Sequence, residues 1–170
     1  QPKVKPREDD DFNIRKDIIV DGGAGTFSSP HRKYFLPHTL RPTKVTLAGI
    51  DNQSRPADLE GIAQVCFPDS KQRIIWRITT PGVLTETAMP DGYTLLSLSQ
   101  LRASDGIGNI TPSDPDESPY LYTGSIHSPS RCAYIREVSE GLLSITPLSP
   151  RRIQARVAGY GLRYYDGAPP

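Results

Sequence analysis

Short runs of alternating apolar and polar residues occur along most of the chain, and their length is typical of β-strands. The alternation is clear at residues 43–50 and again at 72–80, where Ile74, Trp76 and Ile78 share one side of an extended chain. Further strands are expected at residues 12–20, 62–67, 93–98, 121–126, 132–138, 142–146 and 152–165. Eight or nine short strands predict a mainly β protein, a single compact antiparallel β-sandwich or barrel-like domain with long loops.

Residues that favour turns separate most of these runs, and little of the chain is left for helices. Turns are predicted at residues 51–52, 81–82 and 90–92. Residues 57–63 and 99–104 are the candidates for helix, so at most one or two short helices are expected. The segment 31–38 predicts irregular structure or an edge strand, and residues 107–119 predict a long loop.

The chain has 170 residues, enough for one domain with a substantial core. Its 17 prolines suit a β domain rich in loops, because proline fixes φ and donates no backbone hydrogen bond. Residues 1–11 hold little to bury and predict a flexible linker or arm, so the domain is expected to span residues 12–170. Without an initiator methionine or a signal peptide, the sequence suggests a fragment or a processed product.

The charge balance and the motifs exclude several classes of function. The 20 basic and 19 acidic side chains leave a net charge of +1, whereas dedicated nucleic-acid binders carry a strong basic excess. No nucleic-acid partner is therefore expected. Phosphate-binding and dinucleotide-binding glycine patterns are absent, and no cysteines or histidines occur at metal-ligand spacing. The sequence accordingly predicts neither a cofactor nor a bound metal.

Three features of the composition leave alternatives open. Arginines gather in the last part of the chain, where they would form a solvated face or a contact for an acidic partner or neighbouring subunit. Cys66 and Cys132 each lie in an apolar run, and free thiols fit better than a bridge because disulfide-framed secreted domains normally carry more cysteines. Glycosylation patterns at Asn52 and Asn109 matter only in the secretory route.

The segment DGGAGTFSSPHRKYF, at residues 21–35, is the main candidate for chemistry. Ser28, Ser29 and His31 are residue types that form an activated nucleophile when a base and an orienting acid converge. Ser29 and His31 share one side of an extended chain, and Asp51, at a turn, could orient the imidazole from across a sheet. These residues predict a hydrolase-like site. A polar loop whose serines bond backbone groups is the structural alternative.

The other two histidines of the chain, His38 and His127, lack the sequence context of a catalytic residue. The run GSIHS at residues 124–128 differs from a nucleophile elbow, because it lacks the closing glycine and a following helix. His38 lies between Pro37 and Thr39 with no chemical partner nearby in the sequence. Neither histidine is assigned a role.

The run FNIRKDIIVDGGAGTFSSPHRKYFLPHTLRPTKVTLAGI, at residues 12–50, and the proline-rich β pattern resemble the C-terminal protruding domain of an iflavirus major capsid protein. The resemblance covers essentially the whole chain and rests on overall similarity. It implies a β-rich knob on the virion surface, joined to the shell through residues 1–11, in a capsid assembled in the host cytoplasm. It also implies contacts with a host-cell receptor or membrane and with neighbouring capsid subunits.

In related viruses an Asp-His-Ser group in this domain is a proposed hydrolase-like site, and His31, Ser28 or Ser29 and Asp51 would correspond to it. Three functions therefore stay open. The first is a capsid surface module for attachment or entry. The second is an entry hydrolase (esterase, lipase or protease), in which Ser29 attacks, His31 acts as base and Asp51 orients the histidine. The third is a non-viral β-sandwich adhesion module, which a Cys66–Cys132 bridge would favour.

Overall fold

A computed structural model describes residues 13–48, 54–68, 75–105, 108–110, 120–125, 128–138, 142–147 and 164–166. The strands are β1 (Ile18–Asp21), β2 (Phe27–Ser29), β3 (Arg41–Pro42), β4 (Thr46–Ala48), β5 (Ser54–Pro56), β6 (Leu59–Pro68), β7 (Ile75–Leu84), β8 (Thr94–Ser97), β9 (Gly108–Ile110), β10 (Tyr120–Ser125), β11 (Ser128–Tyr134), β12 (Arg136–Val138), β13 (Leu142–Ile145) and β14 (Tyr164–Asp166). The helices are α1 (Leu98–Asp105) and two 3₁₀ turns, η1 (Arg32–Tyr34) and η2 (Pro37–Thr39). The mainly β class predicted from the sequence is confirmed. The predicted arm at residues 1–11 lies outside the described residues.

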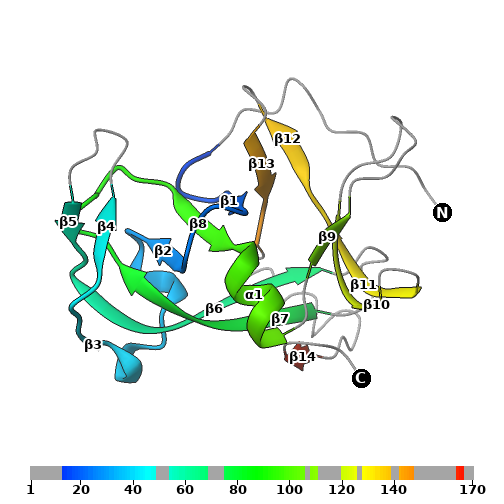
Figure 1. The fold of residues 1–170 in the computed structure, drawn as a ribbon, viewed down its shortest axis with the longest axis horizontal. Coiled ribbons are helices and arrows are strands. Elements are labelled where there is room, and N and C mark those ends of the chain that lie inside the picture. Colours follow the sequence, from blue (N-terminus) through cyan, green and yellow to red (C-terminus); the bar gives the residue numbers. More distant parts are fainter. Residues whose placement is uncertain are drawn as a thin grey trace, which may run out of the picture.

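The main sheet runs in the order β12-β13-β1-β8-β2-β7-β6-β3, and β14 also pairs with β7. It is mixed: β1 and β8, β2 and β7, and β14 and β7 are parallel pairs, while its other pairs are antiparallel. The β4–β5 hairpin and the sheet β11-β10-β9 lie toward opposite ends of the main sheet (Figure 1). β8 lies between β1 and β2, so the glycine-rich segment 22–26 crosses over one strand instead of closing a hairpin.

The hydrophobic core covers one face of the main sheet, as the two-residue period of strands requires. On β6 the core-facing positions are Ala63, Val65 and Phe67. Their partners on β7 are Thr80, Ile78 and Trp76, in that order. Phe27 projects to the same face from β2 and is fully buried. Its ring makes edge-to-face contacts with Tyr34 and Phe35, at centroid distances of 6.0 and 5.9 Å. The turn η1 and the residue that follows it, Phe35, thus close over the core.

Two local predictions were wrong because strand pairing overrides local propensity. Residues 57–63 form no helix, since β6 begins at Leu59 and pairs with β7 over ten residue pairs. Residues 81–82 form no turn, since β7 continues through them to Leu84. Pro81 is tolerated there because Ile62, the residue opposite, directs its N–H to Thr39 and its C=O to Leu36 instead of to β7.

The strand expected at residues 12–20 begins only at Ile18. Residues 14–16 form a turn that the neighbouring Asn13 and Asp17 close. The backbone N–H of Asn13 donates to Asp17 Oδ2 over 2.8 Å, and Asp17 N–H donates to the Asn13 carbonyl over 2.8 Å. This local exchange satisfies the backbone groups of the turn and places two basic residues, Arg15 and Lys16, at its exposed tip.

Candidate functional site

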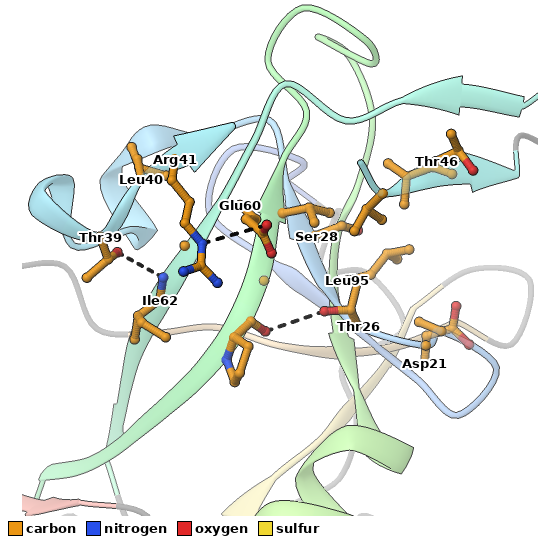
Figure 2. A pocket seen from close by; sticks show the side chains of 18 of the residues that line it. Asp21, Thr26, Ser28, Thr39, Leu40, Arg41, Thr46, Glu60, Ile62 and Leu95 are labelled. Carbon is orange, nitrogen blue, oxygen red and sulfur yellow. Dashed lines mark hydrogen bonds and ion pairs between the residues drawn. The ribbon is translucent and has the colours of Figure 1, made fainter. Parts of the chain in front are cut away.

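A cross-strand row of side chains forms the floor of a groove on the face of the main sheet opposite Phe27. Residues that are paired across neighbouring strands project to the same face. The pairs Arg41–Glu60, Glu60–Val83, Val83–Ser28 and Ser28–Leu95 therefore line up one row across β3, β6, β7, β2 and β8. Figure 2 shows Ser28 between Glu60 and Leu95 on this floor.

The groove has a volume of about 1040 Å³. Its walls come from the glycine-rich segment, from the end of η2 with β3, and from the segment that leads into β4. Residues from these walls include Gly23, Gly25, Thr26, His38 and Thr46. This is the size of a cavity that holds a small molecule or a few side chains of a partner protein.

The charged pair at one end of the groove is held loosely. Arg41 Nε lies 3.7 Å from Glu60 Oε1, and the two side chains are 74% and 35% exposed. A pair at this distance and exposure contributes little to stability, so its members are available to a ligand. Thr39 differs, since its hydroxyl donates to the Leu36 carbonyl over 2.7 Å and accepts the Ile62 N–H over 2.9 Å. Arg41 and Glu60 are thus the exchangeable polar groups, and Thr39 is structural.

The two candidate serines lie on opposite faces of β2, because successive residues of a strand alternate. Ser28 lines the groove and forms no side-chain hydrogen bond within the described part of the chain. Ser29 is fully buried on the core face. Its hydroxyl lies 2.8 Å from the Thr94 hydroxyl and accepts the backbone N–H of His31 over 3.0 Å. The two serines therefore have different surroundings and cannot substitute for each other.

The imidazole of His31 makes neither serine contact that the hydrolase hypothesis requires. His31 lines a second pocket, and none of the residues around that pocket lines the groove. Its Nε2 atom is buried without a hydrogen-bond partner in the described structure. Burial lowers the pKa of His31 below 6.5, the backbone of Ile14 opposes this shift, and the charges of Lys33 and Arg15 add to the lowering. The neutral imidazole is thus favoured at neutral pH.

The predicted acid, Asp51, lies outside the described residues, so the hydrolase-like set stays a prediction. What the structure brings together is Ser29 and the backbone of His31, which matches the structural alternative of a serine that bonds the main chain. Cys66 is half-buried on β6, and the side chain of Cys132 lies outside the described residues. Among the residues described, no group of His, Cys, Asp and Glu is arranged to hold a metal ion.

Two features of the groove, His38 and the Arg41–Glu60 pair, were not predicted from the sequence. His38 received no role, yet it is the histidine that shares a cavity with Ser28. The Arg41–Glu60 pair joins residues that are 19 positions apart, and it depends on the register between β3 and β6. No local sequence pattern predicts either feature. For the Arg41–Glu60 pair the reason is that β3 has only two residues.

No protein-family model, curated protein or solved structure matches the chain. None of the helices in the described part of the chain is long and apolar enough to cross a membrane.

We predict that Ser29→Ala destabilises the protein by about 1–3 kcal/mol, because it leaves the buried Thr94 hydroxyl and the His31 N–H without their partner. Urea denaturation measures this loss. Ser28→Ala is the matched control, because Ser28 is also buried but its hydroxyl has no hydrogen-bond partner among the described residues, so its effect should stay within about 0.5 kcal/mol. If Ser29→Ala kept full stability and abolished hydrolysis of a chromogenic ester, the structural role of Ser29 would be wrong and the hydrolase hypothesis would gain support.

Proposed function

We propose that the chain is a surface domain of a virus capsid that attaches the particle to a host-cell receptor through the groove, without catalysing a reaction. The observation that carries this proposal is the groove itself. Its floor spans five strands, and its charged pair is loosely held: Arg41 and Glu60 lie 3.7 Å apart, with Arg41 exposed and Glu60 half-buried. The resemblance of the sequence to iflavirus protruding domains supports a location on the virion surface, next to neighbouring capsid subunits.

A binding role fits the chemistry of the groove better than a catalytic role. A hydrolase needs a nucleophile, a base and an oxyanion site within hydrogen-bond reach of one reacting atom. The hydroxyl that faces the groove belongs to Ser28, while His31 lines another pocket. Receptor binding needs only a complementary surface with a few anchoring side chains. Arg41 can serve as such an anchor by exchanging its contact with Glu60 for one with the receptor.

The rigidity of the floor also favours recognition. β2 pairs with β7 on one side and with β8 on the other, so the backbone at Ser28 is held from two sides, and β7 in turn pairs with β6 along its whole length. A preformed surface binds with a smaller loss of conformational entropy than a flexible one. The groove can therefore present Arg41 and Glu60 at a fixed spacing to a partner.

The experiment measures binding of the fluorescently labelled chain to cultured host cells, and its ability to block infection by the virus. We expect saturable binding that Arg41→Glu weakens by about tenfold or more, because the substitution reverses the charge at the end of the groove. Arg102→Glu is the matched control, since Arg102 is exposed on α1 and does not line the groove.

Two outcomes would contradict the proposal. Absence of saturable binding to host cells at any concentration of folded chain would exclude an attachment role. Equal losses with Arg41→Glu and Arg102→Glu would show that net charge, and not the groove, determines binding.

A further inference from the structure

A second pocket, lined by Ile14, Arg15, His31, Lys33, Pro90, Asp91 and Gly92, collects basic side chains; we call it the basic pocket. Its volume is about 440 Å³, which is within the range of pockets that hold small ligands. It is built where the turn at residues 14–16, the start of η1 and the turn at residues 90–92 meet.

The cations of the basic pocket have no ion-pair partner in the described part of the chain. Lys33 Nζ donates to the Arg15 carbonyl over 2.6 Å and lies 5.1 Å from the centre of the Tyr34 ring, so it contacts no carboxylate. Arg32, the residue before Lys33, differs in this respect. Arg32 is satisfied by Glu86, with three N–H···O contacts of 2.7–3.0 Å. The fold thus neutralises Arg32 and leaves Lys33 and Arg15 available.

The acidic groups near the basic pocket do not neutralise it. Asp17 is buried, and its two oxygens accept the Thr146 hydroxyl over 2.6 Å and the Asn13 N–H over 2.8 Å. Asp91 lines the pocket but forms no ion pair with Lys33 or Arg15. Lys33 is instead repelled by a neighbouring cation: burial lowers the pKa of Lys33, and the charge of Lys16 lowers it further.

His31 lines the pocket and carries a ring nitrogen with no hydrogen-bond partner among the described residues. This nitrogen, Nε2, is buried. An unpartnered buried polar atom costs free energy, and a ligand oxygen at that position would remove the cost. The ring of Tyr34 packs edge-to-face on His31 at a centroid distance of 6.3 Å and leaves this nitrogen unpaired.

We propose that the basic pocket binds the sulfate or phosphate ester group of an anionic sugar, with Arg15 and Lys33 holding the oxyanion and His31 Nε2 bonding one of its oxygens. Tetrahedral oxyanions are the ligands that clustered arginine and lysine side chains favour. The proposal does not depend on the attachment role of the groove, and it holds for the isolated chain.

A sugar fits this pocket better than a membrane surface does. Stable binding to a membrane surface combines basic charge with exposed apolar side chains, and Tyr93 is the one large apolar residue exposed in the described part of the chain. Asp91 repels a dense layer of anionic headgroups, whereas its carboxylate accepts hydrogen bonds from the hydroxyl groups of a sugar ring. The position of Asp91 beside the cations therefore favours a ligand that carries both an anion and hydroxyl donors.

Isothermal titration of the purified chain with a heparin tetrasaccharide tests the proposal. We expect binding that falls with added salt and is lost when the sulfate groups are removed from the tetrasaccharide. Lys33→Gln and Arg15→Gln should each weaken binding by about tenfold. Arg102→Gln, which removes one exposed charge outside the pocket, should change affinity by less than about twofold.

The pH dependence provides a test specific to His31. Because the ligand-free pocket keeps His31 neutral, an anion that pairs with the imidazolium raises its pKa, and binding should tighten from about pH 7.5 to about pH 5.5. This change should be absent in His31→Gln. Asp91→Asn keeps an oxygen that accepts a hydrogen bond from a sugar hydroxyl but removes the negative charge beside the bound oxyanion, so it should tighten binding by a few-fold. This exposed substitution keeps the test valid if a cation variant misfolds.

Four results would overturn the proposal. The first is that the desulfated tetrasaccharide binds as well as the sulfated one, and the second is that Arg102→Gln and Lys33→Gln lose equal affinity. The third is that affinity is unchanged in both Asp91→Asn and Lys33→Gln. The fourth is that vesicles containing anionic phospholipid bind more tightly than the tetrasaccharide and depend on the same residues. Competition by inorganic sulfate, together with loss of binding in Lys33→Gln, would support an oxyanion site.

Discussion

Replacing Phe27 with alanine is expected to lower the free energy of unfolding by about 3–5 kcal/mol. Phe27 is fully buried, and its ring contacts both Tyr34 and Phe35 edge-to-face. The loss combines the transfer free energy of the ring with the cavity that it leaves. Typical domains are stable by about 5–15 kcal/mol, so this single change removes a large part of the total. Urea denaturation followed by far-UV circular dichroism measures it.

The same substitution is expected to disturb both proposed binding regions, because Phe27 fixes the start of the segment that builds them. Ser28 follows it on the groove floor, and His31 begins the wall of the basic pocket. Tyr93→Ala is the comparison, since it removes an aromatic ring that is 45% exposed and should cost less than half as much. Equal costs for the two variants would show that Phe27 does not anchor the core.

The fold class could be predicted from the sequence because alternation along a strand is a local signal. The pairing partners could not, since they depend on contacts between distant segments. β6 illustrates this, as residues 57–63 suggested a helix before the pairing with β7 was known. The same holds for Pro81, whose tolerance depends on where Ile62 directs its backbone groups. The parallel pairing of β1 with β8 also left no local trace.

The candidate site was predicted only in part, for a related reason. The sequence placed Ser29 and His31 on one side of an extended segment, and the structure does bring them together. The contact, however, uses the backbone N–H of His31, and Thr94 from β8 takes the other side of the Ser29 hydroxyl. Whether a serine and a histidine meet through side chains or through the main chain depends on rotamers and burial, which spacing alone does not determine.

Replacing Gly82 with alanine is the second change with a large expected effect, a loss of about 2–3 kcal/mol. A Cβ atom at this position would lie 2.8 Å from Phe27 Cδ1 and 3.0 Å from the Phe27 carbonyl oxygen. The second contact is to backbone, so β2 itself would have to move away from β7. Gly25→Ala is the matched control, because a Cβ there meets nothing within 4 Å. It should leave stability unchanged or raise it by about 0.4–1 kcal/mol.

A double-mutant cycle separates the contact of the new Cβ with the Phe27 ring from its contacts with the Phe27 carbonyl oxygen and Cβ. In a Phe27→Ala background the clash with Cδ1 is gone while the clash with the carbonyl oxygen stays, so the cost of Gly82→Ala should fall without vanishing. A cost that is the same in both backgrounds would mean that the Phe27 ring does not occupy the space above Gly82. A smaller cost would show that the absence of a side chain at Gly82 lets the Phe27 ring enter the core. Gly82 would then also help to keep Ser28, the next residue on β2, in its place on the floor of the groove.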